Sequence, residues 1–223
     1  MHSHLIPQID DGAKSLEESI SLIRELKNMG FQKIITTPHI MSEHYPNTPE
    51  KIRLGFEKLK NELVRIGLEI EIEVAAEYFV DEKFFELLQA NSELMTFGNN
   101  QILIEFSTFS KSNNIHELIF QLNTKGYLPI LAHPERYLYY ADDFNFFKKI
   151  KSMGCDFQVN ILSLSNYYGS AQKKLGMKLL KEGLVDYLGT DIHRMNQVGN
   201  LNILNDKKIN ALLQKNKFKN NNL

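Results

Sequence analysis

Histidine and acidic residues recur along the chain, each time at or close behind the end of a short apolar run. A His-x-His pair opens the series, and an Asp-x-His pair closes it. The set comprises His2, His4, Asp11, His39, Glu77, Glu105, His133, Asp191 and His193. Imidazole and carboxylate groups without thiolates suit Mn, Fe or Zn, and so many groups exceed the needs of a single ion. The pattern therefore predicts a site for two or three divalent metal ions.

Each of these signals has an ordinary structural interpretation when it is taken alone. A His-x-His pair can arise by chance or from packing, and Glu77 or Glu105 could be a buried salt-bridge partner. His39 and His133, each beside a proline, could be core histidines. Gathered in one place, however, so many ionisable groups would repel one another and lose hydration unless cations neutralised them. Only the metal site accounts for the whole set.

A thiol mechanism is not supported. The only cysteine is Cys155, and a cysteine-dependent phosphatase needs an arginine six positions later, where this sequence has Ile161. Cys155 follows a glycine and precedes an apolar run, so we expect a small buried core residue rather than a nucleophile. A single cysteine also cannot form an internal disulfide.

The overall composition argues against several other classes of protein. The chain has 223 residues, with 26 Lys+Arg against 27 Asp+Glu and a net charge of −1. This balance argues against nucleic-acid binding over a broad basic face. No stretch approaches the ~18 consecutive apolar residues of a membrane-spanning helix. We therefore expect a soluble, cytoplasmic protein that neither binds nucleic acid nor inserts into a membrane.

Glycines that follow helical stretches and precede apolar runs divide the chain into similar units of about 30 residues. They are Gly30, Gly67, Gly98, Gly126, Gly154 and Gly183. Glycine is favoured just past a helix end because it adopts a positive φ without a Cβ clash. The runs predict strands at Lys33–Thr37, Glu69–Ala76, Gln101–Phe106, Leu128–Ala132, Asp156–Ile161 and Asp186–Thr190.

Amphipathic stretches between these runs predict the helices. In the first of them, Ser15 and Glu18 fit an N-terminal capping box, and an apolar stripe follows from Leu16 to Met29. The other helices are predicted at Pro49–Ile66, Glu82–Ala90, Ile115–Lys125, Asp143–Met153 and Ala171–Glu182.

Alternation of strands and helices without a long linker predicts an α/β fold with parallel strands. A short first strand at His2–Leu5 would give seven units, which favours a distorted (β/α)₇ TIM-like barrel over a doubly wound open sheet. Few residues precede His2, so we expect either a truncated first strand or further chain before Met1. We expect one domain over residues 1–206, then a Lys- and Asn-rich helix or frayed tail over residues 207–223. The active site of such a barrel lies at the strand ends, where the ligand candidates fall.

The ordered motifs resemble those of the PHP (polymerase and histidinol phosphatase) superfamily. They are His2-Ser3-His4, Asp10-Asp11-Gly12, Thr37-Pro38-His39, Ala76-Glu77-Tyr78, Ile104-Glu105, Ala132-His133-Pro134-Glu135-Arg136-Tyr137 and Thr190-Asp191-Ile192-His193. The Asp-Asp-Gly and His-Pro-Glu-Arg-Tyr motifs are most similar to the branch of bacterial manganese-dependent tyrosine-protein phosphatases from capsule and exopolysaccharide loci. The resemblance implies the PHP type of distorted barrel and a site for three ions.

The resemblance also implies how the ligands divide among the ions, for which Mn is the first expectation and Fe or Zn the alternatives. One ion would take His2, His4, Glu77 and Asp191. A second would share Glu77 and add Glu105 and His133. A third would take Asp11, His39 and His193.

Two arginines are candidates for contacting the substrate phosphate. Arg136 matches the family position expected to do so, although it could instead form a surface salt bridge with Glu135. A second family arginine is expected where this sequence has Val198, and Arg194 could replace it from a different loop geometry.

The reaction that the resemblance implies is hydrolysis of protein phosphotyrosine by a hydroxide that bridges two ions, because bound metal lowers the pKa of water to ~7 in favourable cases. The implied partner is a bacterial tyrosine autokinase with a tyrosine-rich tail, acting in capsule or exopolysaccharide synthesis. Two alternatives stay open: a phosphatase for small phosphomonoesters such as histidinol phosphate, and a non-catalytic metal-binding scaffold. The presence of every expected ligand argues against the scaffold.

Aromatic residues that follow the ligand candidates bear on the choice of substrate. They are Tyr45, Tyr78, Phe79, Phe106, Phe109, Tyr137, Tyr139 and Tyr140. A phosphotyrosine carries its phosphate about 6.5 Å from Cβ, so metals recessed below an aromatic rim would favour it over phosphoserine. The alternative is that most of these rings pack in the core.

Overall fold

The computed structural model describes residues 1–112 and 114–223. The chain has an α/β fold with parallel strands, and it divides into two compact units. The first unit comprises Met1–Phe97 with Thr190–Gly199, and the second comprises Gly98–Gly189 with Asn200–Leu223. The predicted α/β class with parallel strands is therefore confirmed.

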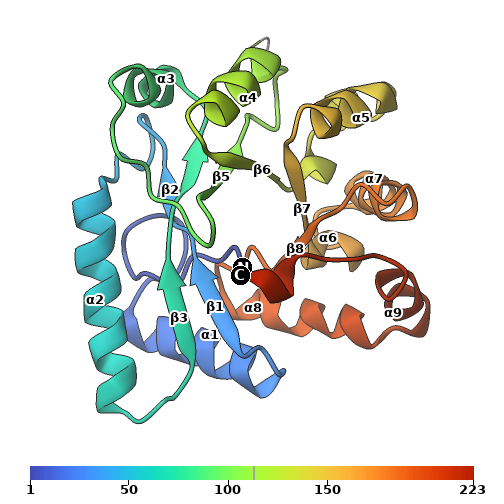
Figure 1. Ribbon diagram of the computed structural model, residues 1–223. Helices are drawn as coiled ribbons and strands as arrows, with labels where there is room; N and C mark the ends of the chain where they lie inside the picture. Colours follow the sequence, from blue (N-terminus) through green and yellow to red (C-terminus); the bar gives the residue numbers. More distant parts are fainter. Residues whose placement is uncertain (113) are drawn as a thin grey trace. The chain divides into compact units, whose positions relative to one another are not determined.

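Short strands of the first unit pair in parallel (Figure 1). Their bounds are β1 (Lys33–Thr36), β2 (His39–Ile40), β3 (Glu71–Val74) and β4 (Glu77–Phe79). Strand β1 pairs with β3, and β2 pairs with β4 in a register that sets His39 opposite Glu77. Pro38 has no N–H to donate, so the ladder is interrupted there. The strands β2 and β4, which the apolar pattern did not predict, carry two ligand candidates.

The N-terminal segment lies beside the segment that begins at Thr190. Ser3 forms an isolated parallel bridge with Ile192, and the Asp191 N–H donates to the His2 carbonyl over 2.9 Å. The predicted strand over His2–Leu5 is reduced to this bridge because His2 has a φ of 63°, outside the β region. The pairing brings the His-x-His pair alongside the Asp-x-His pair.

The first unit contains three helices that begin close to the predicted positions and one short helix that was not predicted. They are α1 (Leu16–Asn28), α2 (Pro49–Arg65), α3 (Glu82–Gln89) and the short α8 (Met195–Val198). Ser15 Oγ accepts the Glu18 N–H over 3.2 Å as the capping box predicts, but the Glu18 carboxylate accepts from the Lys14 N–H instead of from Ser15. Helix α8 packs on α1, and α2 packs on β3.

The second unit contains a parallel sheet in the order β5-β6-β7-β8. Its strands are β5 (Gln101–Glu105), β6 (Leu128–Ala132), β7 (Asp156–Asn160) and β8 (Tyr187–Gly189). Every residue of β5 is buried, and so are four of the five residues of β6 and of β7. Burial on both faces explains why these strands read as continuous apolar runs.

Helices of the second unit connect and cover these strands. They are α4 (Ile115–Thr124), α5 (Phe144–Ser152), α6 (Ile161–Leu164), α7 (Ser170–Lys181) and α9 (Lys207–Leu213). Short 3₁₀ helices occur at Pro134–Arg136, Leu138–Tyr140, Gly199–Asn205 and Asn220–Asn222. In the part of the chain that the structure describes, no helix combines the length and apolar character needed to cross a membrane.

The C-terminal segment forms the predicted helix, α9, and its last residues are docked rather than frayed. Lys219 Nζ lies 2.6 Å from Asp156 Oδ2 and 3.1 Å from Asp186 Oδ1. The Asn220 side chain accepts the Leu188 N–H over 3.0 Å and donates to the Leu188 carbonyl over 2.9 Å. The Asn220 amide therefore provides hydrogen-bond partners for the N–H and the carbonyl of Leu188 in strand β8.

The six glycines of the repeat all have positive φ, between 51° and 95°. A side chain at these positions would be strained, which explains the glycine directly after the C-caps of α1, α2, α4, α5 and α7; Gly98 instead lies in a turn before β5, beyond the end of α3. The predicted strands after Gly30, Gly67, Gly98, Gly126, Gly154 and Gly183 each contain an observed strand, whereas β2, β4, α6 and α8 were not predicted.

Candidate metal centre

Buried imidazole and carboxylate groups converge in the first unit. His2 Nε2 lies 3.1 Å from Glu77 Oε2 and 3.2 Å from Asp191 Oδ1. His4 Nε2 lies 3.3 Å from the same Glu77 oxygen and 3.4 Å from His2 Nε2. All four side chains are buried. The structure thus brings together the four residues expected to hold the first ion.

The carboxylates give this buried group a strongly negative potential. Burial lowers the pKa of both histidines, but the facing carboxylates outweigh it, raising the pKa of His2 to about 10 and that of His4 well above its ordinary value. Burial likewise opposes ionisation of Asp191, yet His2 and His4 hold the pKa of this carboxyl well below its usual range. A divalent cation would meet the same potential and replace those protons. The donor set, with imidazole and carboxylate but no thiolate, fits Mn, Fe or Zn.

A more exposed group of ligand candidates lies beside the buried one. His39 Nε2 and His193 Nε2 lie 3.5 Å and 3.4 Å from Asp11 Oδ1. Together with His4, these residues offer ligand atoms within 4.8 Å of one another. His39 Nδ1 also lies 3.2 Å from Glu77 Oε2, which links the two groups. The Asp11 side chain is 47% exposed, so this group faces solvent.

Asp10, which was not predicted as a site residue, holds two of the ligand-bearing segments in place. Its Oδ2 accepts from His4 Nδ1 over 2.8 Å and from the His39 backbone N–H over 3.0 Å, and its Oδ1 accepts the Gly12 N–H over 2.9 Å. Burial favours the neutral carboxyl, but His4 outweighs it and lowers the pKa of Asp10. An ionised carboxylate only accepts, so Nδ1 of His4 carries the proton and Nε2 faces the ligands. The sequence pattern selected the neighbouring Asp11 as a ligand candidate. The role of Asp10 can be recognised only from its contacts with His4 and His39 in the folded protein.

We expect Asp10→Asn to weaken Mn²⁺ binding by about 10- to 100-fold, because the amide nitrogen would face two N–H donors and His4 would lose its orienting partner. Isothermal titration calorimetry of the metal-free protein measures this change. Asp142→Asn, at an exposed position, is the control and should bind Mn²⁺ like the original protein. Unchanged affinity in Asp10→Asn would show that His4 needs no orienting carboxylate.

Three of the ligand candidates adopt the left-handed backbone region that favours glycine. The φ angles are 63° for His2, 49° for Asp191 and 34° for His133. Such residues cost ~1–3 kcal/mol each and persist where surrounding contacts fix them. In the first unit, the His2 carbonyl accepts both the Thr190 hydroxyl, over 2.8 Å, and the Asp191 N–H. These bonds hold the two ligand-bearing segments together.

The second unit carries the remaining ligand candidates at two adjacent strand ends. Glu105 is the last residue of β5, and His133 directly follows β6. His133 Nε2 lies 3.6 Å from Glu105 Oε2, and both side chains are buried. Within this unit the structure therefore joins the two residues expected to complete the second ion's ligands.

Arg136 lies three residues after His133, at the end of a 3₁₀ turn. Its guanidinium carbon is 4.9 Å from the centre of the Tyr168 ring, a cation–π arrangement that restrains the side chain. The carboxylate of Glu135 is buried and accepts from Asn160 N–H over 2.9 Å and from Ser163 Oγ over 2.6 Å. The Glu135 carboxylate is therefore directed into the protein, towards Asn160 and Ser163, and does not lie at the surface.

Arg194 lies beside the more exposed ligand group. Its Nη2 donates to the Asp11 carbonyl over 2.9 Å, and the residue is the N-cap of α8, the helix that carries Val198. This placement brings a cation next to the loop that holds Asp11. A contact between Arg194 and phosphate stays a prediction.

Four of the eight predicted rim aromatics pack in the interior. The buried rings are Tyr78, Phe106, Tyr137 and Tyr140. Two others face the site or solvent: the Tyr45 ring stacks on His39 with centroids 5.5 Å apart, whereas Phe109 is 96% exposed. The core interpretation is therefore right for the four buried residues, whereas the Tyr45 ring contacts one of the ligand candidates, His39.

Cys155 is buried, as predicted, and burial raises the pKa of its thiol. We expect Cys155→Ser to leave kcat unchanged within about twofold and to cost ~1 kcal/mol of unfolding free energy through burial of a hydroxyl. Steady-state kinetics and chemical denaturation of the same preparation measure both. A hundredfold fall in kcat in a folded variant would revive the thiol mechanism.

Known proteins resemble this chain over most of its length. A family model for capsular polysaccharide synthesis, CpsB/CapC, matches residues 1–202. The chain belongs to the CpsB/CapC family. Tyrosine-protein phosphatase CpsB of Streptococcus agalactiae is 31% identical over 201 residues, which cover 87% of this chain and 82% of the relative. Tyrosine-protein phosphatase YwqE of Bacillus subtilis is 26% identical over 195 residues, covering 87% and 77%.

The fold of this family has also been seen in crystals. A chain from the crystal structures of YwqE from Bacillus subtilis and CpsB from Streptococcus pneumoniae, which are metal-dependent tyrosine phosphatases, matches with a TM-score of 0.83. The match covers 97% of this chain and 94% of that chain at 23% identity. The resemblance to the tyrosine-phosphatase branch that the motifs indicated is therefore confirmed.

Proposed function

We propose that this protein is a metal-dependent phosphatase that removes phosphate from protein phosphotyrosine in capsule or exopolysaccharide synthesis. The observation that carries the proposal is the buried convergence of His2, His4, Glu77 and Asp191, which fits a divalent ion. Membership of the CpsB/CapC family and the phosphatase names of its relatives support the substrate class.

Three ions, with Mn²⁺ as the first candidate and Fe or Zn as alternatives, would use all the ligand candidates. The proposed sets are His2, His4, Glu77 and Asp191; Glu77, Glu105 and His133; and Asp11, His39 and His193. Once bound, such ions supply Lewis-acid charge for the phosphoryl oxygens and lower the pKa of the attacking water.

The side chains of this protein then position the substrate. Arg136 offers the planar pair of donors that matches phosphoryl oxygens, and the Tyr168 ring limits its movement. Arg194 is the candidate for the second phosphate contact. Burial raises the pKa of Asp11, but His193 and His39 outweigh it and lower this pKa, so the carboxylate is ionised and carries no proton for the leaving group. A tyrosinate leaving group, with an unperturbed pKa of ~10, needs little protonation.

We propose that residues 1–206 form a single domain, the distorted (β/α)₇ barrel of the PHP type. Parallel strands with ligand candidates at or just past their ends, present in each unit, support this arrangement, as does the fold match to the YwqE and CpsB structures. The proposed partner is a tyrosine autokinase with a tyrosine-rich tail, in the cytoplasm.

The decisive experiment compares phosphotyrosine peptides, phosphoserine peptides, histidinol phosphate and p-nitrophenyl phosphate, with Mn²⁺ and after chelation. We expect kcat/KM on phosphotyrosine peptides to be at least about tenfold higher than on phosphoserine peptides or histidinol phosphate. Chelation should abolish hydrolysis, and Mn²⁺ should restore it. Equal or better kcat/KM on histidinol phosphate would indicate a small-molecule phosphatase. A metal-loaded protein inert towards p-nitrophenyl phosphate would indicate a scaffold.

A further inference from the structure

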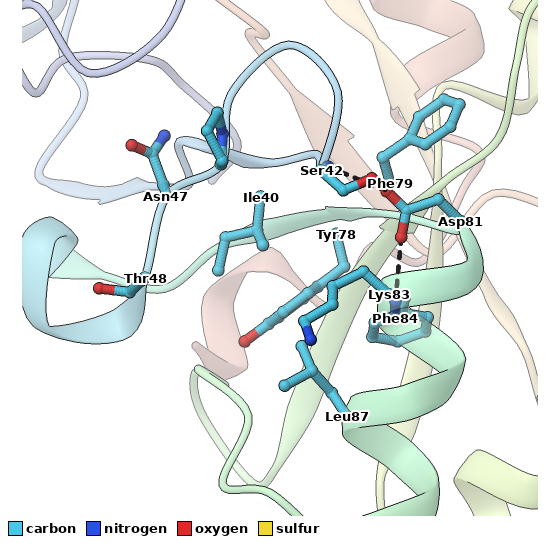
Figure 2. A pocket seen from close by; sticks show the side chains of 11 residues that line it. Ile40, Ser42, Asn47, Thr48, Tyr78, Phe79, Asp81, Lys83, Phe84 and Leu87 are labelled. Carbon is cyan, nitrogen blue, oxygen red and sulfur yellow. Dashed lines mark hydrogen bonds between the residues drawn. The ribbon is translucent and has the colours of Figure 1, made fainter.

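A cavity of about 220 Å³ lies in the first unit, next to strands β2 and β4 but outside the ligand groups. Its walls are mostly apolar, and it is bounded by both strands, the loop that follows β2, and helix α3. Figure 2 shows Ile40 and Leu87 on either side of the Tyr78 ring. The proposed reaction does not use this space.

The cavity and the metal centre lie on opposite faces of the same two strands. Ile40 directly follows His39, and Tyr78 directly follows Glu77, and both pairs are in register. Successive side chains of a strand point to opposite faces, so His39 and Glu77 face one way whereas Ile40 and Tyr78 face the cavity. The two groups of side chains therefore lie on either side of the same pair of strands.

One hairpin borders both sites. Met41 and Tyr45 exchange backbone hydrogen bonds of 3.0 Å and 2.9 Å. The Tyr45 ring stacks on His39, whereas Ser42 within the hairpin and Pro46, directly after Tyr45, line the cavity. A chain bound over this hairpin would therefore touch the metal centre and the cavity at once.

The cavity is preformed because hydrogen bonds tie its walls together. Asp81 Oδ2 accepts from both the N–H and the hydroxyl of Ser42, over 2.9 Å and 2.7 Å. Asp81 Oδ1 accepts the Phe84 N–H over 2.9 Å and caps helix α3. Figure 2 draws the contact of Asp81 with Ser42 and its contact with Phe84. The hairpin and the helix are thus held by one carboxylate, and binding needs little rearrangement.

We propose that this cavity receives an aromatic side chain of the protein substrate, close in sequence to the phosphotyrosine. The inference rests on the proposed function and specifies its substrate. Small-molecule sites usually measure about 300–1,000 Å³, so this cavity suits one side chain rather than an independent ligand. The walls offered by Ile40, Tyr78 and Leu87 are apolar or aromatic.

The test uses phosphotyrosine peptides that carry a single phenylalanine in an alanine and serine background, moved through four positions on each side of the phosphotyrosine. We expect one position to raise kcat/KM by about tenfold over the peptide without phenylalanine, the scale set by burial of one large apolar group. A non-hydrolysable phosphotyrosine analogue in the same peptides, followed by fluorescence anisotropy, should bind about tenfold more tightly at that position.

Leu87→Trp, which fills the cavity, should remove the preference for phenylalanine in both assays and leave p-nitrophenyl phosphate hydrolysis unchanged. Leu54→Trp, at an exposed position on α2, is the matched control and should keep the preference. Leu87→Ala enlarges the cavity and should shift the preference from phenylalanine to tryptophan.

Two results separate the failure of this inference from the failure of the proposed function. Hydrolysis of all peptides at one rate, or a preference that survives Leu87→Trp in a folded variant, would overturn the cavity's role while leaving the phosphatase intact. Absence of hydrolysis of every phosphotyrosine peptide by a protein active on p-nitrophenyl phosphate would overturn both.

Discussion

Replacing Glu77 by alanine is expected to lower kcat/KM on a phosphotyrosine peptide by ~10³-fold or more and to reduce the metal content of the protein. One oxygen of this buried carboxylate lies within 3.1–3.3 Å of nitrogens of His2, His4 and His39. Its removal takes away negative charge from the centre of both ligand groups in the first unit. Steady-state kinetics and mass spectrometric metal analysis of the purified variant measure the two effects.

Two further variants test the explanation. Glu77→Gln keeps the size of the side chain but removes its charge, so it should lose metal and activity nearly as completely as Glu77→Ala. Glu73→Ala, on β3, removes a carboxylate that is partly exposed and pairs with Lys33 at the surface, and it should change kcat/KM less than twofold. Near-normal turnover of Glu77→Ala with unchanged metal content would refute the proposed sharing of this residue between ions.

The second large effect is expected from Arg136→Ala, which should lower kcat/KM by ~10²-fold, the scale seen when a donor to the transition state is removed. Arg136→Lys should recover only part of the loss, because a point charge does not reproduce the planar pair of donors. The metal content should stay unchanged in both variants, since no metal ligand is altered. Kinetics with p-nitrophenyl phosphate and with a phosphotyrosine peptide should show similar losses, because both substrates present the same phosphate.

Other arginines provide the comparison for Arg136. Arg65→Ala, which removes an exposed partner of Glu62 on α2, should leave kcat/KM unchanged. Arg194→Ala should cost as much as Arg136→Ala if Arg194 supplies the second phosphate contact, and nothing if it only bonds the Asp11 carbonyl. An Arg136→Ala variant with normal kcat/KM would exclude this residue from phosphate recognition.

Most of the longer helices and strands could be predicted from the sequence because capping residues and apolar patterns are local features of the chain. The helix that starts after Ser15 has its cap and its apolar stripe within a few turns, and strands β5, β6 and β7 read as apolar runs because both of their faces are buried. Strands β2 and β4 were missed because each is three residues or shorter and is defined by pairing across the chain, not by an apolar run.

The types and order of the ligand candidates were also legible in the sequence, since imidazole and carboxylate side chains at strand ends have few other uses in such number. Their division into sets came from the family resemblance and not from the spacing of the residues. Asp10 became a site residue only when folding set it against His4 and His39. The left-handed backbone of His2 and Asp191 could not be predicted either, because local preference disfavours it and long-range hydrogen bonds impose it.

What the sequence by itself determined is therefore the kind of chemistry and the strand ends that carry it. The tertiary structure decided which donors lie together in the metal centre and that the Tyr45 ring stacks on His39. It also decided where a cavity lies beside strands β2 and β4. The physical reason is the distance along the chain over which each effect acts. Propensity, capping and apolar periodicity depend on neighbouring residues, whereas the His2–Glu77 and His2–Asp191 contacts join residues far apart in the sequence. Such contacts exist only after the strands have paired and the backbone around each ligand has been fixed.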